Sequence, residues 1–152
     1  MTITQRLRDA YATAIVQIER DDHRLTVMPA APGRVSGPFP EDAEVVHIVT
    51  AWNPRSAPLA PHVNAARQRQ LRAVATTLPS RWIAASDGHD PARTWSEDSL
   101  AIADADEVAV VALARRFDQH AIYGWTPDAR TTLWVADGRR DAGGWTCVRQ
   151  PG

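Results

Sequence analysis

The stretch A-I-Y-G-W-T-P-D-A-R-T-T-L-W-V, residues 121–135, holds two runs of β-forming residues on either side of a turn. Aromatic and β-branched residues dominate residues 121–125 and 131–135. Thr126-Pro127-Asp128 lies between the runs and is typical of a tight turn. The stretch therefore predicts a β-hairpin, and it makes the sheet antiparallel at this point.

The rest of the chain adds further strands to this hairpin. Residues 14–18 are rich in β-branched residues and residues 24–28 alternate polar and apolar side chains. With the turn at Asp21-Asp22 between them, they predict a second hairpin. Residues 45–51, V-V-H-I-V-T-A, are apolar nearly throughout, which predicts a central strand covered on both faces. Shorter strands are predicted at residues 81–85 and 99–102, and residues 144–148 predict an edge strand.

Helices are predicted in three places. Residues 2–12 form a short amphipathic segment, and residues 61–78 have an apolar stripe between Pro61 and the terminating Pro79. A third helix follows Asp104, with Glu107 three residues later in the arrangement of a capping box. We predict polar loops at residues 29–42 and 86–98.

These elements predict an α+β fold. Consecutive hairpins favour a mixed, largely antiparallel sheet with two or three helices packed on it. A chain of 152 residues fits a single domain, residues 1–152, whose core needs neither metal nor disulfide.

The composition excludes several classes of function. The chain has 17 basic residues, all of them arginine, so a phosphate-loop lysine, a Schiff-base lysine and a lysine general base are all excluded. The net charge is −1 and the arginines form no stripe, so we expect no nucleic-acid partner. Cys147 is the only cysteine, and the histidines lack metal-site spacing, so we expect no metal and no cofactor.

The same sequence predicts a cytoplasmic protein. No apolar run is long enough to cross a membrane, and residues 1–8 lack the apolar core of a signal peptide, so we expect no membrane partner. The oligomeric state cannot be deduced from these features.

The most informative candidate site lies at the start of the helix 61–78. Its apolar stripe comprises Leu71, Val74 and Leu78. Extended backwards by the same spacing, the stripe passes through Arg67 and Asn64, close to Asn53 after the central strand. A helix N-terminus with an arginine favours an anionic ligand, whereas the structural alternative pairs Arg67 with a carboxylate. Glu97 is the partner we name.

Three further residues complete the candidate site. Glu97 lies just before a predicted strand and is a candidate general acid or base, or else a solvated loop carboxylate. Trp95 can stack on a ring. Gln119 follows the third helix and can either bind a ligand amide or cap the helix carbonyls.

Three classes of function fit these residues. The first is a ligand-binding or regulatory domain with a polar pocket for a small anionic or amide-bearing molecule. The second is an enzyme that uses the same pocket with Glu97 as acid or base, although no nucleophile accompanies it. The third is a protein-interaction domain in which the polar cluster is a structural network.

Several short sequence motifs of the chain resemble those of a known family. They are Tyr11 with Thr13, I-V-T-A-W-N-P at residues 48–54, Asn64-x-x-Arg67, Trp95-x-Glu97-x-Ser99, and Phe117-x-Gln119-x-Ala121-Ile122-Tyr123. In these strings the chain resembles a bacterial family, domain of unknown function 3293, to about residue 136. The proline-rich loop at residues 29–40 departs from the family pattern. The resemblance implies no established activity.

Overall fold

The structure is a computed structural model and describes residues 3–152. Its elements in chain order are α1 (Gln5–Thr13), β1 (Ile15–Glu19), β2 (His23–Ala30), β3 (Val35–Ser36), β4 (Val46–Val49), the 3-10 helix η1 (Pro54–Ser56), α2 (Pro61–Ala75), β5 (Trp82–His89), β6 (Ser96–Ala103), α3 (Glu107–Arg116), β7 (Ala121–Trp125), β8 (Arg130–Trp134) and β9 (Arg140–Pro151). The α+β class and the three helices are confirmed.

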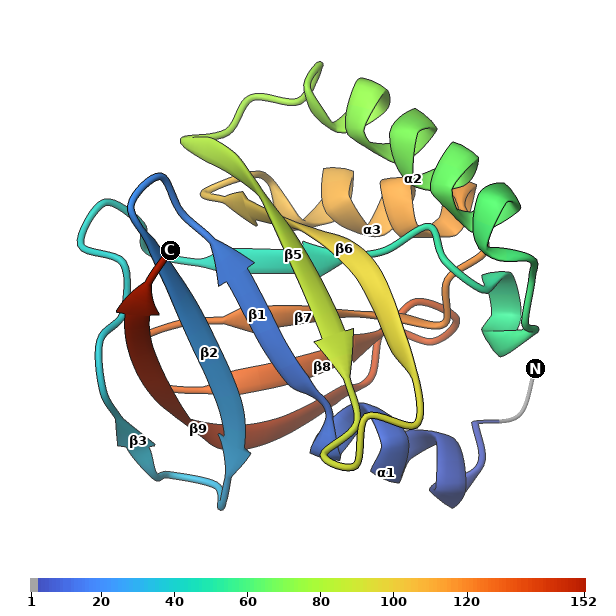
Figure 1. Cartoon of the computed structure of the whole chain (residues 1–152). Coiled ribbons are helices and arrows are strands. Elements are labelled where there is room, and N and C mark those ends of the chain that lie inside the picture. The colour runs from blue at the N-terminus through green and yellow to red at the C-terminus, as the bar shows by residue number, and fades with distance from the viewer. Residues whose placement is uncertain (1–2) are drawn as a thin grey trace.

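The sheet closes on itself and forms a barrel (Figure 1). Its strand order is β2-β1-β5-β6-β4-β7-β8-β9, and β2 also pairs with β9. Each of these eight neighbouring pairs is antiparallel, and the short β3 adds one parallel pairing to β9. The strand predicted at residues 144–148 is confirmed as part of β9, but its edge position is wrong. Residues 140–143 of β9 pair with β8, residues 144–151 pair with β2, and β3 adds a pairing at Trp145 and Thr146.

Two apolar cores lie on the two faces of this sheet. Val46 and Ile48 of β4 point into the barrel, where they join Trp125 and Trp145. Val49, at the end of the same strand, packs in the second core with side chains of α2 and α3. The two cores explain why this strand is apolar on both faces, and the prediction of a covered central strand is confirmed.

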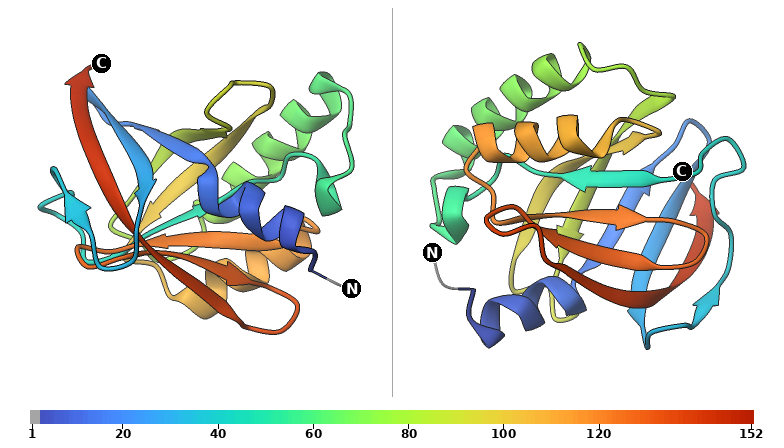
Figure 2. Two further views of the ribbon diagram at one scale, coloured as in Figure 1. Left: turned by 90° about the horizontal axis from the view of Figure 1, so that it is seen from below. Right: turned by 180° about the vertical axis from the view of Figure 1, so that it is seen from behind.

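The three helices cover different parts of the barrel. Two views show α2 and α3 side by side against one side of the sheet, while α1 lies across one end of the barrel (Figures 1 and 2). The cap predicted for α3 is off by two residues. Asp106 caps the helix by accepting a hydrogen bond from the Val108 amide, while Asp104 accepts bonds from the amides of Glu44 and Val45.

The β5–β6 hairpin is longer than the sequence indicates. The loop predicted at residues 86–98 is wrong over most of its length, since β5 runs to His89 and β6 starts at Ser96. Polar residues in these strands pair across the ladder, with Asp87 opposite Asp98 and Gly88 opposite Glu97. Glu97 is consequently held on a strand of the barrel wall rather than on a loop.

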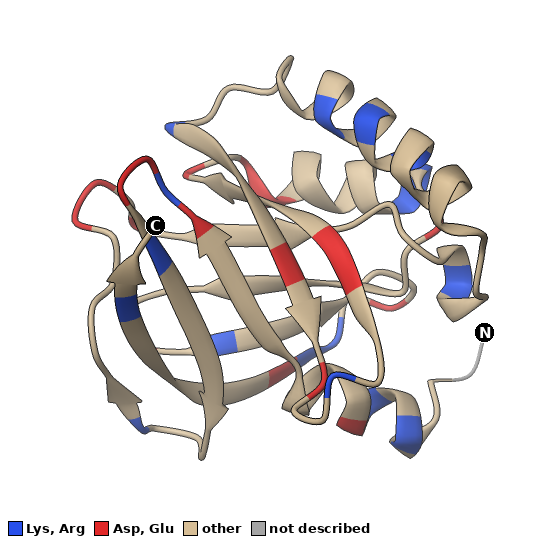
Figure 3. Cartoon of the chain, in the orientation of Figure 1, with Lys and Arg blue, Asp and Glu red and all other residues tan. Residues whose placement is uncertain are grey.

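Charged side chains are distributed over many elements (Figure 3). Basic residues occur at several positions along α2, and acidic residues occur on both β5 and β6. No helix within residues 3–152 is both long and apolar enough to cross a membrane.

Candidate functional site

A cavity of about 320 Å³ lies between α1 and the neighbouring end of the barrel. Its lining residues are mostly apolar or aromatic: Leu7, Ala10, Tyr11, Ala14, Val16, Ile48, Pro58, Trp95, Ala121 and Tyr123. The polar residues in its wall are Thr50, Asn53, Ser56, Glu97 and Ser99, and Gly88 completes the lining. Apolar walls with a few polar groups are typical of small-molecule sites of this size.

Helix α1 supplies one side of the cavity. Thr4 caps the helix by accepting a hydrogen bond from the Leu7 amide. Tyr11 near its end packs against Tyr123 and Trp134, with ring centroids 5.8 and 5.0 Å away. The Tyr123 hydroxyl also donates a hydrogen bond of 2.7 Å to the Tyr11 carbonyl. These contacts fix the C-terminal end of α1, while none of its nine residues is fully buried.

The polar side of the cavity is a network centred on Asn53. Its Nδ2 donates a hydrogen bond of 3.0 Å to a carboxylate oxygen of Glu97. Asn64 holds Asn53 in place from α2: its Oδ1 accepts from the Asn53 amide at 2.9 Å, and its Nδ2 donates to the Asn53 Oδ1 at 2.7 Å. Asn64 is buried, and its role is to orient the group that touches Glu97.

Glu97 is the one carboxyl group among the described residues that line the cavity. Burial raises the pKa of its carboxyl, and the hydrogen bond from Asn53 opposes that effect only in part. Asn53 is the one side chain among the described residues that donates to it. A half-buried carboxyl with a raised pKa can accept a hydrogen bond from a ligand or exchange a proton with it.

The backbone beside this network is strained. Asn53, Arg55 and Ser56 have positive φ angles of 45°, 54° and 60° although none of them is glycine. Such conformations cost about 1–3 kcal/mol each and persist where the surrounding structure imposes them, often at functional sites. Here the Arg55 amide is fixed by the Asp118 carbonyl at 2.8 Å, and both Asn53 and Ser56 line the cavity.

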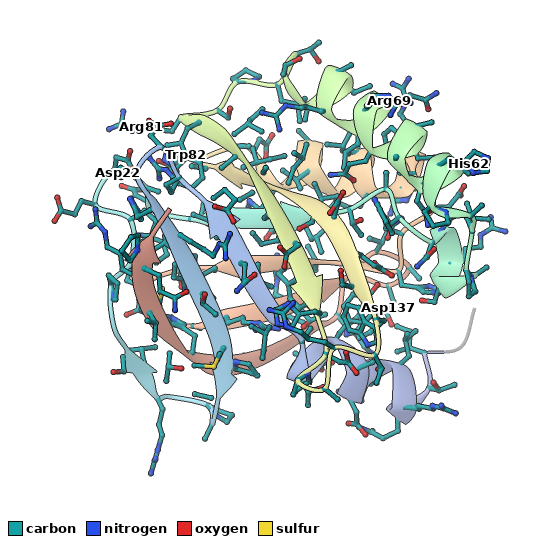
Figure 4. The ribbon with its side chains drawn as sticks, viewed as in Figure 1. Asp22, His62, Arg69, Arg81, Trp82 and Asp137 are labelled. Carbon is teal, nitrogen blue, oxygen red and sulfur yellow. The ribbon has the colours of Figure 1, made fainter. Side chains whose placement is uncertain are left out.

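Arg67 lies on the inner side of α2, as the stripe predicts, but its predicted partner is wrong. Its Nε donates to the Ala51 carbonyl at 2.8 Å and its Nη2 to the Phe117 carbonyl at 2.7 Å, whereas Glu97 pairs with Asn53. His62 and Arg69 on the same helix point away from the sheet (Figure 4). Since two backbone carbonyls occupy the Arg67 guanidinium, its position is explained by the fold.

Gln119 has a similar structural role. Its Nε2 donates to the carbonyls of Phe117 and Trp52, both at 3.1 Å, so it satisfies a carbonyl at the end of α3 and ties that end to the segment after β4. Of the two roles that the sequence allows, the structure shows the capping role.

The cavity thus brings together half of the predicted site residues. Asn53, Trp95 and Glu97 line it, whereas Asn64, Arg67 and Gln119 lie behind its wall and are not part of the lining. No cluster of three metal-binding side chains forms between residues 3 and 152.

The aromatic half of the site is not predicted by the sequence. Tyr11 and Tyr123 belong to the motifs that resemble the family, and the resemblance implies no role for them. The signal lay in the hairpin 121–135, where strand alternation sends Tyr123, Trp125 and the charged Arg130 to one face. An arginine opposite a tryptophan on a core-facing strand is unusual enough to mark a site.

Comparison with known protein families gives a match. Residues 49–122 match the family described as "Protein of unknown function (DUF3293)". The segment begins at the end of β4 and ends in β7, so it includes Asn53, Asn64, Arg67, Glu97 and Gln119. The resemblance noted from the sequence is confirmed over this segment. Neither the curated proteins nor the solved structures gave a match.

Proposed function

We propose, from the premise that residues 49–122 are a region of the DUF3293 family, that this protein is a binding or ligand-sensing domain for a small molecule. The observation that supports the proposal is the cavity of about 320 Å³, with apolar walls and one half-buried carboxylate. A volume of this order suits a molecule about the size of a single substituted ring.

The lining suggests the chemistry of the ligand. An apolar body packs against Leu7, Tyr123 and Trp95, and a hydrogen-bond donor such as an amide N–H faces Glu97. Asn53 donates to one carboxylate oxygen of Glu97. The second oxygen has no side-chain donor within residues 3–152, so it can accept a hydrogen bond from the ligand. Arg67 is not the anchor in this proposal, because its guanidinium already binds two carbonyls.

Phenylacetamide is a suitable probe because it combines a ring with an amide donor. We expect saturation-transfer NMR to detect its binding to the native protein at millimolar concentration. Ala10→Trp fills the cavity from α1 and should abolish binding, while Ala12→Trp on the exposed side of the same helix should leave it intact. Equal binding by both variants would refute the proposal.

A second candidate function is acid–base catalysis in the same cavity. The raised pKa of Glu97 and the strained backbone at Asn53 and Ser56 favour it. If the protein is an enzyme of this kind, a bound amide or ester should be converted over hours, as followed by NMR. Glu97→Gln should then stop conversion while binding persists; binding without conversion by the native protein, across a panel of amides and esters, would exclude this second candidate.

A further inference from the structure

Arg130 is a buried cation inside the barrel. It is the first residue of β8, opposite Trp125 of β7, and its exposed fraction is 6%. The strand alternation that turns Trp125 into the inner core places the guanidinium in the interior as well. An arginine keeps its charge in proteins, so a positive charge is buried among apolar side chains.

The hydrogen bonds of this guanidinium are incomplete. Its Nη2 donates to the Tyr11 carbonyl at 3.2 Å, and the guanidinium carbon Cζ lies 4.6 Å from the centre of the Tyr123 ring. Its Nη1 is buried and has no partner in the described part of the chain. No carboxylate within residues 3–152 forms an ion pair with it, although Arg8, Arg20, Arg24 and Arg140 each have one.

The missing counter-charge is energetically significant. Burial lowers the pKa of Arg130, which reflects the cost of removing the charged guanidinium from water. A neighbouring aromatic face and one carbonyl compensate only part of that cost, since a buried charge normally needs an opposite charge and further hydrogen bonds. A buried guanidinium with an unpartnered Nη1 can pair with an anion.

A small void beside Arg130 lies next to the cavity. It has a volume of about 10 Å³, enough for roughly one water-sized group. Its lining shares Val16, Ile48 and Tyr123 with the larger cavity, so the two spaces are separated by common side chains. A terminal oxygen of a ligand in the larger cavity would lie next to the guanidinium if it entered this void.

We propose that the ligand of the cavity is a small monocarboxylic acid, and that its carboxylate is the partner of Arg130. The inference rests on the proposed ligand-binding function and narrows it. An apolar or aromatic body fills the cavity, the carboxylate faces Arg130, and a hydrogen-bond donor faces Glu97. One carboxylate oxygen fits the small void better than a bulkier phosphate, and it can accept a charge-assisted hydrogen bond from the unpartnered Nη1 of Arg130.

Phenylacetate and phenylacetamide test this inference as a pair, because they have nearly the same shape and differ in charge. At pH 7 we expect the native protein to bind phenylacetate at least tenfold more tightly, measured by NMR titration. Arg130→Met should lose this preference while keeping the affinity for phenylacetamide, and Arg130→Lys should restore part of the preference. Arg115→Met is the control, since Arg115 donates one hydrogen bond to the Val135 carbonyl outside the barrel and should leave the preference unchanged.

Stability gives a second readout. Arg130→Met should retain or increase the melting temperature, because an uncompensated charge is replaced by an apolar chain. Equal affinities of the native protein for the two probes would overturn the carboxylate inference. Such a result would still agree with the proposed ligand-binding function. A preference that survives in Arg130→Met would overturn it equally. Failure of both probes to bind the native protein would refute the ligand-binding function itself.

Discussion

Arg67 on α2 donates a hydrogen bond of 2.7 Å to the backbone carbonyl of Phe117, the C-cap residue of α3. Its other hydrogen bond reaches the Ala51 carbonyl after β4. A single side chain therefore joins two helices and the end of a central strand. The same guanidinium packs beside the Phe117 ring, 5.7 Å from its centre.

Arg67→Met should therefore destabilise the fold. Two hydrogen bonds from a charged donor are lost and two carbonyls are left without this donor, which costs about 2–3 kcal/mol. Urea denaturation measures the loss. Arg69→Met on the outward face of α2 should change the free energy of unfolding by less than about 0.5 kcal/mol. A similarly small change for Arg67→Met would show that the two bonds contribute little.

Glu97 should make the stability of the protein depend on pH. Its folded-state pKa is raised above the ordinary value of 4.5, so its contribution is fully present below about pH 4.5 and is lost as the pH rises through the folded pKa. Glu97→Gln removes the ionisation, and the variant should melt higher than the native protein at pH 7.

Melting temperatures measured from pH 4 to pH 8 check this expectation, with Asp98→Asn on the exposed neighbour as the control. The advantage of Glu97→Gln should disappear near pH 4. An advantage that is the same at both ends of the range would contradict a raised pKa.

Relief of the backbone strain at η1 should stabilise the protein. Arg55 is exposed and has a φ of 54°, which glycine adopts without steric cost. Arg55→Gly should raise the free energy of unfolding by up to about 1 kcal/mol, since relief of strain exceeds the entropy that glycine adds to the unfolded chain. Ala57→Gly, at a φ of −88°, should instead destabilise it. Chemical denaturation distinguishes the two, and a loss in both variants would show that no strain is stored at Arg55.

Glu107 should contribute stability that acid removes. Its hydrogen bond from Arg140, with a smaller effect of His47, lowers the pKa of Glu107 to about 2 from 4.5. The contribution is therefore present above about pH 4.5 and is lost as the pH falls towards 2. The side chain is 35% exposed, so solvent screening limits the effect to about 1 kcal/mol. Glu107→Gln should flatten the acid limb of the pH–stability curve between these values; an unchanged limb would contradict this assignment.

Much of the local structure could be predicted from the sequence. The hairpin 121–135, the covered strand at Val46–Val49 and the inward position of Asn64 and Arg67 all follow from side-chain periodicity. Periodicity reports which face is buried and says little about the contact made there. The partners of Arg67 are backbone carbonyls, which every residue possesses, so no sequence pattern could distinguish them from Glu97.

Closure of the barrel could not be predicted for a related reason. It depends on the register between β2 and β9, which pairs His23 with Pro151 and Ala30 with Gly144. Neither strand contains a signal for a partner so distant in the chain. The cavity and its buried Arg130 follow from that closure, and for this reason they were not predicted.

The pairing of β2 with β9 also imposes an order on synthesis and folding. Until residues 140–151 leave the ribosome, β2 and β8 are open sheet edges with unpaired backbone amides and carbonyls. Nascent chains can pair with one another through such edges and aggregate. The contacts that close the barrel join residues far apart in the sequence, which raises the contact order. We therefore expect the chain to fold slowly. We also expect the chain to be most prone to aggregation in the interval before β9 emerges.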